Sequence, residues 1–179
     1  MSNVRLAIIG NGMVGHRFIE ELLDKAEPGQ FDITVFCEEP RIAYDRVHLS
    51  SYFSHHTAEE LSLVREGWYE KRGVKVLVGE RAITINRQEK VIHSSAGRTV
   101  YYDKLIMATG SYPWIPPIKG SDTPDCFVYR TIEDLNAIEA CARRSKRGAV
   151  VGGGLLGLEA AGALKNLGVE THVIEFAPM

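Results

Sequence analysis

The chain has 179 residues, which is long enough for one domain or for parts of two. Hydrophobic residues make up 45% of it and charged residues 25%, as in an ordinary globular protein. The net charge of −2 argues against general binding to nucleic acid or membranes, and no apolar run is long enough to span a bilayer. No secretion signal is evident, and Cys37, Cys126 and Cys141 have neither C-x-x-C nor zinc spacing, so reduced thiols in a cytoplasmic protein are expected.

The first chemical motif lies near the N-terminus. An apolar run at 6–9 is typical of a buried strand, and a helical pattern follows over 13–25. Between them, Gly10, Gly12 and Gly15 form G-x-G-x-x-G. In such a loop the first glycine permits a tight turn, the second lets a pyrophosphate approach, and the third allows close packing of helix on strand. The helix N-terminus then offers N–H groups to phosphates, so the motif predicts a dinucleotide site.

An acidic residue stands where this kind of site needs one. The strand predicted over 33–37 ends at Glu38, which lies 23 residues after Gly15. A carboxylate about 20 residues beyond the loop accepts hydrogen bonds from an adenosine ribose and repels a 2′-phosphate. Glu39 is the lesser candidate for this role, and the alternative is a solvated acidic pair at a strand end.

The segment 41–53 is expected to be irregular. Within it, the guanidinium of Arg46 could contact a phosphate or a flavin carbonyl, or Arg46 could be a surface arginine. The sequence 57–60 has the pattern of a capping box and predicts a short helix. The adjacent His55 and His56 are not expected to bind metal, because neighbouring residues on a strand face opposite ways.

The next segment combines parallel and antiparallel patterns. Residues 74–78 predict a third parallel strand, and short alternating runs at 81–86, 90–93 and 98–102 predict an antiparallel insertion. Such an insertion is common where a flavin dinucleotide needs additional cover. An apolar strand then ends in A-T-G within 102–111, where small residues let a cofactor and a crossing backbone come close.

A change of domain is expected where prolines stiffen the chain, at 111–122. Residues 127–129 predict a short strand. Thr131 is placed to cap the helix that follows, with Asp134 at the capping-box position.

The opening unit repeats between residues 148 and 175. A strand at 149–151 leads into a second G-x-G-x-x-G, and a helix is expected over 158–167. The glycines of this loop are Gly152, Gly154 and Gly157. Glu175 follows the next strand, 18 residues after Gly157, and its charge favours NADH over NADPH.

Two such units predict an α/β fold. We expect a Rossmann-like FAD-binding domain with a small antiparallel β insertion over residues 1–118. A second Rossmann-like domain, which binds NAD, begins at 119 and is truncated at 179, so the chain is expected to be a fragment of a longer protein. One loop can hold the ADP half of FAD, and the other can hold the ADP half of NADH.

Over its whole length the sequence resembles the pyridine-nucleotide flavoprotein reductases. Within them it is similar to the N-terminal FAD/NAD region of the large subunits of cytoplasmic NADH-dependent nitrite reductases. The stretches that carry the resemblance are LAIIGNGMV at 6–14, ITVFCEEPRIAYDRVHL at 33–49, LIMATGSYPWIPP at 105–117 and VVGGGLLGLEAA at 150–161.

The resemblance implies roles for individual residues. The ADP part of FAD would be bound by Gly10, Gly12, Gly15 and Glu38. Other residues implied at the FAD are Arg46 near the flavin or pyrophosphate, Ala82 with its backbone at the adenine, and Thr109 and Gly110 packed against the cofactor. NADH would be bound by Gly152, Gly154, Gly157 and Glu175. Glu159 would lie near the nicotinamide, with a helix-surface role as the alternative.

The implied activity is hydride transfer from NADH to FAD, with electrons passing on to another redox centre. The stretch Leu49–Ser51 lacks the redox cysteine of disulfide-type relatives, so a thiol relay is not expected, and no acid–base catalyst is assigned. In a full-length relative, the electrons reach a [4Fe–4S] cluster and sirohaem in a downstream domain. Nitrite becomes ammonium there, in nitrate assimilation, with a small subunit as a further partner. This chain alone should not reduce nitrite.

Two other functions stay open. One is a stand-alone NADH:rubredoxin or ferredoxin reductase, which the sequence downstream of this chain would distinguish by whether it contains clustered cysteines. The other is a non-catalytic nucleotide-binding or redox-sensing module.

Overall fold

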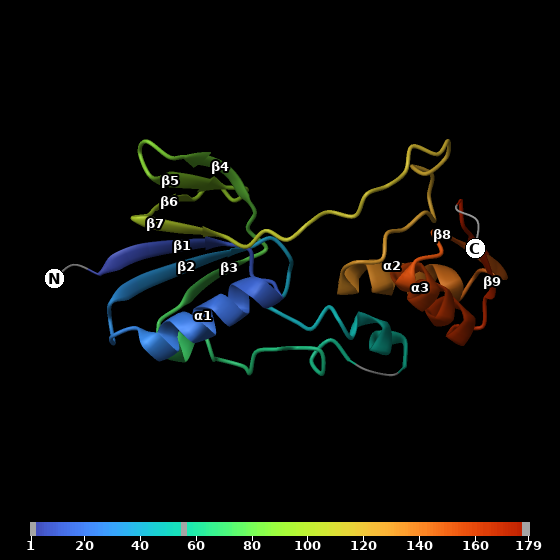
Figure 1. The fold of residues 1–179 in the computed structure, drawn as a ribbon, viewed down its shortest axis with the longest axis horizontal. Helices are drawn as coiled ribbons and strands as arrows, with labels where there is room; N and C mark the ends of the chain where they lie inside the picture. Colours follow the sequence, from blue (N-terminus) through green and yellow to red (C-terminus); the bar gives the residue numbers. More distant parts are fainter. Residues whose placement is uncertain (1–2, 55–56, 177–179) are drawn as a thin grey trace. The chain divides into compact units, whose positions relative to one another are not determined.

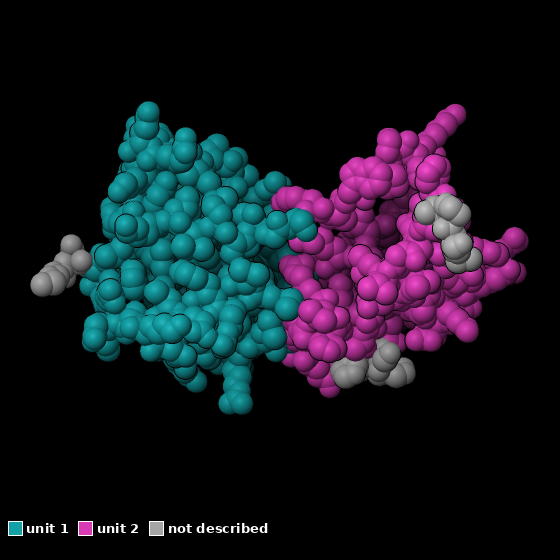
Figure 2. Space-filling model, viewed as in Figure 1, with its two compact units in different colours: residues 1–44, 62–111 teal, residues 45–61, 112–179 magenta. Residues whose placement is uncertain are grey.

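A computed structural model describes residues 3–54 and 57–176 of the chain. It divides into two compact units, one formed by residues 1–44 and 62–111 and the other by residues 45–61 and 112–179 (Figures 1 and 2). The assignment of a domain boundary at residue 118 stays a prediction, and the adjacent histidines at 55 and 56 lie outside the described residues.

The first unit is built on a four-stranded parallel sheet with the order β3-β2-β1-β7. Its strands are β1 (Val4–Ile9), β2 (Phe31–Cys37), β3 (Lys75–Val78) and β7 (Lys104–Met107). The chain therefore runs outward from β1 through β2 to β3 and returns to the other side of β1. Open α/β sheets bind ligands outside the carboxyl ends of their strands at such a reversal, which here lies between β1 and β7.

Both faces of β1 are covered, which explains its continuous apolar run. Leu6 and Ile8 pack into a core with Ile19 of helix α1 (Met13–Lys25). Ala7 and Ile9 point to the opposite face and join a second core with Ile92. Figure 1 shows α1 along one side of the sheet and the antiparallel strands along the other. The two cores fix the strand firmly, and the loop that follows it starts from a rigid base.

The antiparallel insertion is confirmed as a three-stranded sheet with the order β4-β5-β6. It consists of β4 (Ala82–Asn86), β5 (Val91–Ser94) and β6 (Thr99–Tyr101). A short 3-10 helix, η2 (Glu70–Arg72), precedes β3.

The second unit contains the other predicted strand–helix–strand element. Strands β8 (Arg147–Val151) and β9 (Glu170–Ile174) pair in parallel, and α3 (Leu155–Asn166) connects them. Helix α2 (Ile132–Ala142) begins at the predicted capping box, in which Thr131 and Asp134 bond reciprocally. A 3-10 helix, η1 (Leu49–Ser54), also belongs to this unit.

Three local predictions were wrong. Residues 127–129 form no strand and pair with none of the described strands. Thr57 and Glu60 do bond reciprocally, but no helix follows, because the next residue, Leu61, is buried and its carbonyl accepts a hydrogen bond from the Asp45 N–H. Helix α3 begins at Leu155, three residues earlier than predicted, because Gly154 serves as its N-cap.

Within the described ranges, no helix has the length and apolar character needed to cross a membrane.

Candidate nucleotide-binding sites

The first glycine loop is shaped by two contacts that exclude any side chain. Gly10 has φ of +109°, and a β-carbon on it would lie 2.1 Å from the carbonyl oxygen of Ala108. A β-carbon on Gly15 would lie 2.1 Å from the carbonyl oxygen of Gly10. Both glycines are thus required by the fold itself.

Gly12 is different, and the difference points to a ligand. A β-carbon on Gly12 would meet none of the described atoms within 4 Å, and its φ of −88° suits any residue. The chain itself therefore does not require a glycine here. A group that approaches the backbone from outside would, and this is the role expected for the second glycine of a pyrophosphate loop.

Helix α1 presents its N-terminus to the same space. Gly12 is its N-cap, and no described side chain caps the helix or places an acidic group in its first turn. The first regular helical bond runs from the His16 N–H to the Gly12 carbonyl, over 2.9 Å. Unsatisfied N–H groups and the positive end of the helix dipole thus suit a phosphate, so the residues present fit the ADP half of FAD.

The A-T-G segment crosses directly over this loop. The Ala108 N–H donates to the Ile9 carbonyl over 2.8 Å, and the Thr109 nitrogen lies 3.2 Å from the β-carbon position of Gly10. Gly110 follows with φ of +66°. Thr109 and Gly110 are therefore beside the glycine loop, and their contact with a flavin stays a prediction.

The acidic residue at the end of β2 lies near the start of the insertion. Glu38 Oε1 is 3.5 Å from Arg81 Nη1, and about half of each side chain is exposed. Arg81 immediately precedes Ala82, the first residue of β4, so the two residues assigned to the adenosine come together. Glu39 instead accepts a hydrogen bond from the Tyr44 hydroxyl over 2.7 Å. This arrangement favours Glu38 over Glu39 for the ribose.

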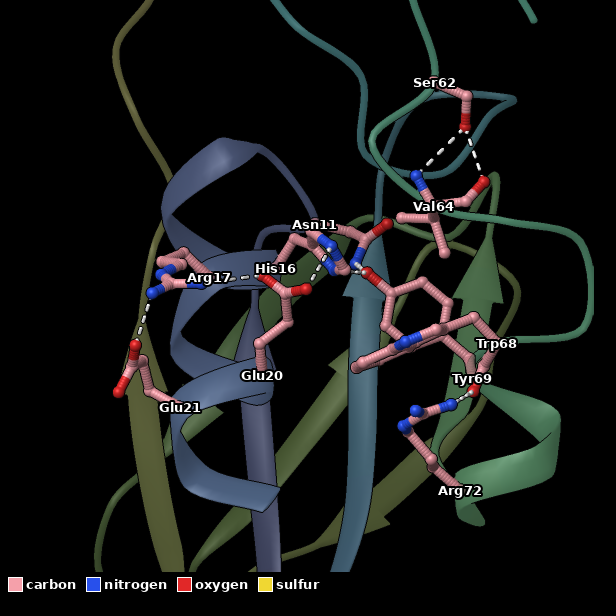
Figure 3. A network of polar contacts seen from close by, with 10 residues as sticks. All are labelled: Asn11, His16, Arg17, Glu20, Glu21, Ser62, Val64, Trp68, Tyr69 and Arg72. Carbon is pink, nitrogen blue, oxygen red and sulfur yellow. Dashed lines mark hydrogen bonds and ion pairs between the residues drawn. The ribbon is translucent and has the colours of Figure 1, made fainter. Parts of the chain in front are cut away.

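A buried polar network supports the loop from the protein side (Figure 3). The hydroxyl of Tyr69 contacts Asn11 Nδ2 at 2.8 Å and His16 Nδ1 at 2.9 Å. All three residues are at least 93% buried. Sequence reasoning missed this network. Asn11 and His16 lie inside the motif, but no pattern in the sequence connects them to a tyrosine more than 50 residues away.

The second loop repeats the geometry of the first. Gly152 has φ of +115°, and a β-carbon on Gly157 would lie 1.9 Å from the Gly152 carbonyl oxygen. Gly154, the N-cap of α3, again has none of the described atoms within 4 Å of its β-carbon position. The space in front of Gly154 therefore suits a second phosphate-bearing ligand, and its binding there stays a prediction.

Glu175 lies directly over this second loop. Its Oε2 accepts a hydrogen bond from the Gly153 N–H over 2.5 Å. A β-carbon on Gly153 would be only 3.0 Å from the same oxygen. The carboxylate predicted to bind the ribose is thus held beside the second glycine loop, and its contact with NADH stays a prediction.

The remaining two predicted residues lie in the second unit. Arg46 Nη1 donates to the Arg130 carbonyl over 3.2 Å, and its role at a flavin stays a prediction. Glu159 is exposed on α3. Burial raises the pKa of Tyr129 to about 12, and the charge of Glu159 contributes to this rise, so these two side chains are close enough to interact. Among the described residues, no cluster of side chains could hold a metal ion.

Two separate parallel sheets each carry a glycine loop that opens a helix and an acidic residue that follows the next strand. This arrangement is typical of an oxidoreductase that uses two dinucleotides. Residues 4–179 match the family described as pyridine nucleotide-disulphide oxidoreductase, and the chain belongs to this family. The family uses FAD and NAD(P)H. The family resemblance predicted from the sequence is therefore confirmed.

Particular relatives narrow this class. The chain is 92% identical over all of its residues to the "Nitrite reductase (NADH) large subunit" of Escherichia coli, of which it covers 21%. It is 49% identical to the "Nitrite reductase [NAD(P)H] large subunit" of Klebsiella oxytoca, with 99% of this chain and 19% of that protein covered. A solved ferredoxin reductase from Rhodopseudomonas palustris is 25% identical with a TM-score of 0.89, and the match covers 98% of this chain and 43% of that one. The chain thus spans about a fifth of the length of these two nitrite reductase subunits.

Proposed function

We propose that this chain is the FAD- and NADH-binding portion of a nitrite reductase large subunit. The observation that carries the proposal is that Gly12 and Gly154 each face open space at an uncapped helix start, within the described residues. A protein with one such loop could bind a single dinucleotide. Two loops allow one dinucleotide to pass electrons to the other.

The first loop is assigned to FAD and the second to NADH. In the first unit, Glu38 lies on the side of the loop assigned to the adenosine, and Thr109 crosses over the loop beside Gly10. In the second unit, Glu175 lies beside Gly153 of the second loop. Bound FAD supplies the chemistry, since a flavin can accept a hydride from NADH and release electrons one at a time. The protein holds both dinucleotides by their phosphates and riboses and thereby fixes the distance and orientation of their reactive rings.

The rest of the polypeptide would complete the reaction. Since the chain covers 21% of the E. coli subunit, the [4Fe–4S] cluster and sirohaem are assigned to the remaining part, where nitrite would be reduced to ammonium. The assembly would include a small subunit and work in the cytoplasm, in nitrate assimilation. This chain would deliver electrons and would not act on nitrite by itself.

A stand-alone ferredoxin reductase is the second candidate. The TM-score of 0.89 to such an enzyme favours it as far as the fold is concerned. The identities of 92% and 49% to nitrite reductase subunits favour the first assignment, and the residues beyond position 179 would decide between the two.

The test is the visible spectrum of the full-length protein, recorded before and after anaerobic NADH. We expect a flavin spectrum that bleaches with NADH and much less with NADPH. The same preparation should then reduce nitrite. A protein that stays colourless with added FAD would overturn the flavoenzyme assignment. Bleaching without nitrite reduction would favour the stand-alone reductase.

A further inference from the structure

We propose that Asn11, Tyr69 and His16 are positioning residues for the first glycine loop. Through a directed chain of hydrogen bonds, they hold it in the shape that receives a pyrophosphate, and they do so only while His16 is neutral. The inference rests on the proposed assignment of FAD to this loop. It adds a determinant of FAD affinity that lies beneath the loop and need not touch the cofactor.

The direction of these hydrogen bonds is set by a backbone N–H group, which can only donate. The Ala43 N–H donates to Asn11 Oδ1 over 2.9 Å, so the amide nitrogen of Asn11 must face the other way. That nitrogen, Nδ2, donates to the Tyr69 hydroxyl over 2.8 Å. The orientation of the Asn11 amide is therefore fixed by its partners.

The next bond fixes the state of the histidine. The proton of the Tyr69 hydroxyl also needs an acceptor. Of the two side-chain atoms that contact this hydroxyl in the described structure, Asn11 Nδ2 can only donate, so the proton points to His16 Nδ1, 2.9 Å away. His16 Nδ1 must then be an acceptor, which makes the ring neutral with its proton on Nε2. The backbone of Leu63 lies close enough to the ring to act against the lowering of its pKa.

Burial favours the same state. His16 is 4% exposed, and loss of hydration lowers the pKa of its imidazole. The charged and titratable groups around the ring are Glu20 and Arg17 of its own helix and Tyr69. Glu20 Oε1 is 3.6 Å from Nε2 and opposes the shift, while Arg17 adds to it.

Aromatic side chains pack against the histidine ring (Figure 3). The Trp68 ring meets the His16 ring edge-on at 5.2 Å and the Tyr69 ring at 5.1 Å. Arg72 lies 4.3 Å from the centre of the Trp68 ring. Because Asn11, His16 and Tyr69 are buried, a mismatch of donors and acceptors among them would be costly.

The network holds the loop at both of its ends. Asn11 stands between Gly10 and Gly12, and His16 follows Gly15. The Tyr69 hydroxyl therefore contacts one residue at each end of the turn that faces the phosphate. Without that hydroxyl, Asn11 Nδ2 loses its acceptor and His16 Nδ1 loses its donor, and the loop is free to leave its binding shape. The affinity for FAD then falls in proportion to the fraction of molecules whose loop has the shape that binds a pyrophosphate.

The experiment uses the full-length protein after removal of its flavin and titrates FAD by fluorescence quenching. Tyr69→Phe keeps the ring and removes only the hydroxyl, and we expect its Kd for FAD to rise about tenfold. Tyr101→Phe is the matched control, since Tyr101 is 59% exposed on β6, and its Kd should not change. NADH affinity should be unchanged in both variants.

A pair of substitutions at the histidine separates positioning from a merely structural role. His16→Asn offers Tyr69 an oxygen near the former Nδ1 that cannot be protonated, whereas His16→Leu offers no acceptor. We expect His16→Asn to bind FAD nearly as well as the parent, and His16→Leu to bind about tenfold more weakly. Because the pKa of His16 is lowered, the titration must extend well below the ordinary histidine value: from about pH 8 to about pH 4.5, Kd should rise in the parent and stay level in His16→Asn.

Several outcomes would overturn the inference. Equal FAD affinity in the parent and Tyr69→Phe would do so, as would equal losses in His16→Asn and His16→Leu. If the variants do not fold, an FAD Kd in the parent that does not change over this pH range would be sufficient. A parent protein that binds no FAD at all would overturn the proposed function instead.

Discussion

The carbonyl oxygen of Gly152 lies 1.9 Å from the position that a β-carbon on Gly157 would occupy. The corresponding distance in the first loop, from the Gly10 oxygen to a β-carbon on Gly15, is 2.1 Å. In both places the helix comes so close to the turn out of the strand that only a hydrogen atom fits. The two loops therefore share a packing constraint in addition to a sequence motif.

This constraint predicts opposite effects of one substitution at two sites in α3. Alanine ordinarily stabilises a helix interior relative to glycine by about 0.5–1 kcal/mol. Gly157→Ala should instead lower the free energy of unfolding by roughly 2 kcal/mol or more, because a backbone oxygen must move. Gly162→Ala is the matched control, since a β-carbon there meets none of the described atoms within 4 Å and should stabilise the helix. Urea unfolding measures both, and two stabilising substitutions would contradict the packing argument.

Substitution of the second glycine in each loop should weaken the binding of one dinucleotide and spare the other. Gly12→Ala and Gly154→Ala should fold normally, because both positions have ordinary φ values and space for a methyl group. Each methyl would stand where a phosphate approaches. Gly12→Ala should therefore weaken FAD at least about tenfold and spare NADH, whereas Gly154→Ala should do the reverse. Calorimetric titration of both ligands against both variants is the measurement. Equal effects on the two ligands would show that the loops are not separate sites.

Much of this architecture could be predicted from local sequence. The β1 strand is a continuous apolar run because both of its faces are buried, and the glycine spacing records how close a helix and a turn must come. The capping box at Thr131 was confirmed as well, since its bonds join residues only three apart.

The errors occurred where distant partners decide the outcome. A β-branched and aromatic run at 127–129 predicts a strand, but a strand needs a neighbour, and Tyr129 instead stacks against Phe53. The network beneath the first loop was missed for the same reason. It depends on Tyr69, which only the folded chain brings to Asn11 and His16.

The junction of Asp103 and Arg5 predicts a pH dependence of stability in the first unit. Asp103 accepts hydrogen bonds from Arg5 Nη2 at 2.8 Å, Nε at 3.1 Å and the backbone N–H at 2.9 Å. The hydrogen bonds from the Arg5 side chain, together with that from its backbone, hold the pKa of this carboxyl well below its ordinary value near 3.8. A carboxylate with a depressed pKa stabilises the fold at pH values above the pKa that it has in the unfolded chain. This stabilisation is lost as the pH falls from there through the lower pKa of the folded state.

Asp103→Asn should therefore lower the unfolding midpoint at neutral pH, and the difference from the parent should shrink below about pH 4. The effect should be modest and should weaken in salt, because both side chains are partly exposed. Urea unfolding at neutral and acidic pH measures it, with Asp122→Asn as an exposed control. A difference that stays constant with pH would show that the interaction does not depend on the charge of Asp103.

Glu175 predicts the choice of coenzyme. Its carboxylate is held against the second loop by the Gly153 N–H, so a 2′-phosphate at the ribose would meet a fixed negative charge. Glu175→Ala should remove this repulsion and bring the ratio of the Kd values for NADPH and NADH at least about tenfold closer to one. Glu170→Ala is the matched control, because Glu170 is an exposed carboxylate at the opposite end of the same strand. Fluorescence titration of both coenzymes against the full-length protein measures the ratio. If Glu175→Ala leaves it unchanged while Glu170→Ala alters it, the ribose lies at the other end of β9 and the second loop does not bind the dinucleotide as assigned.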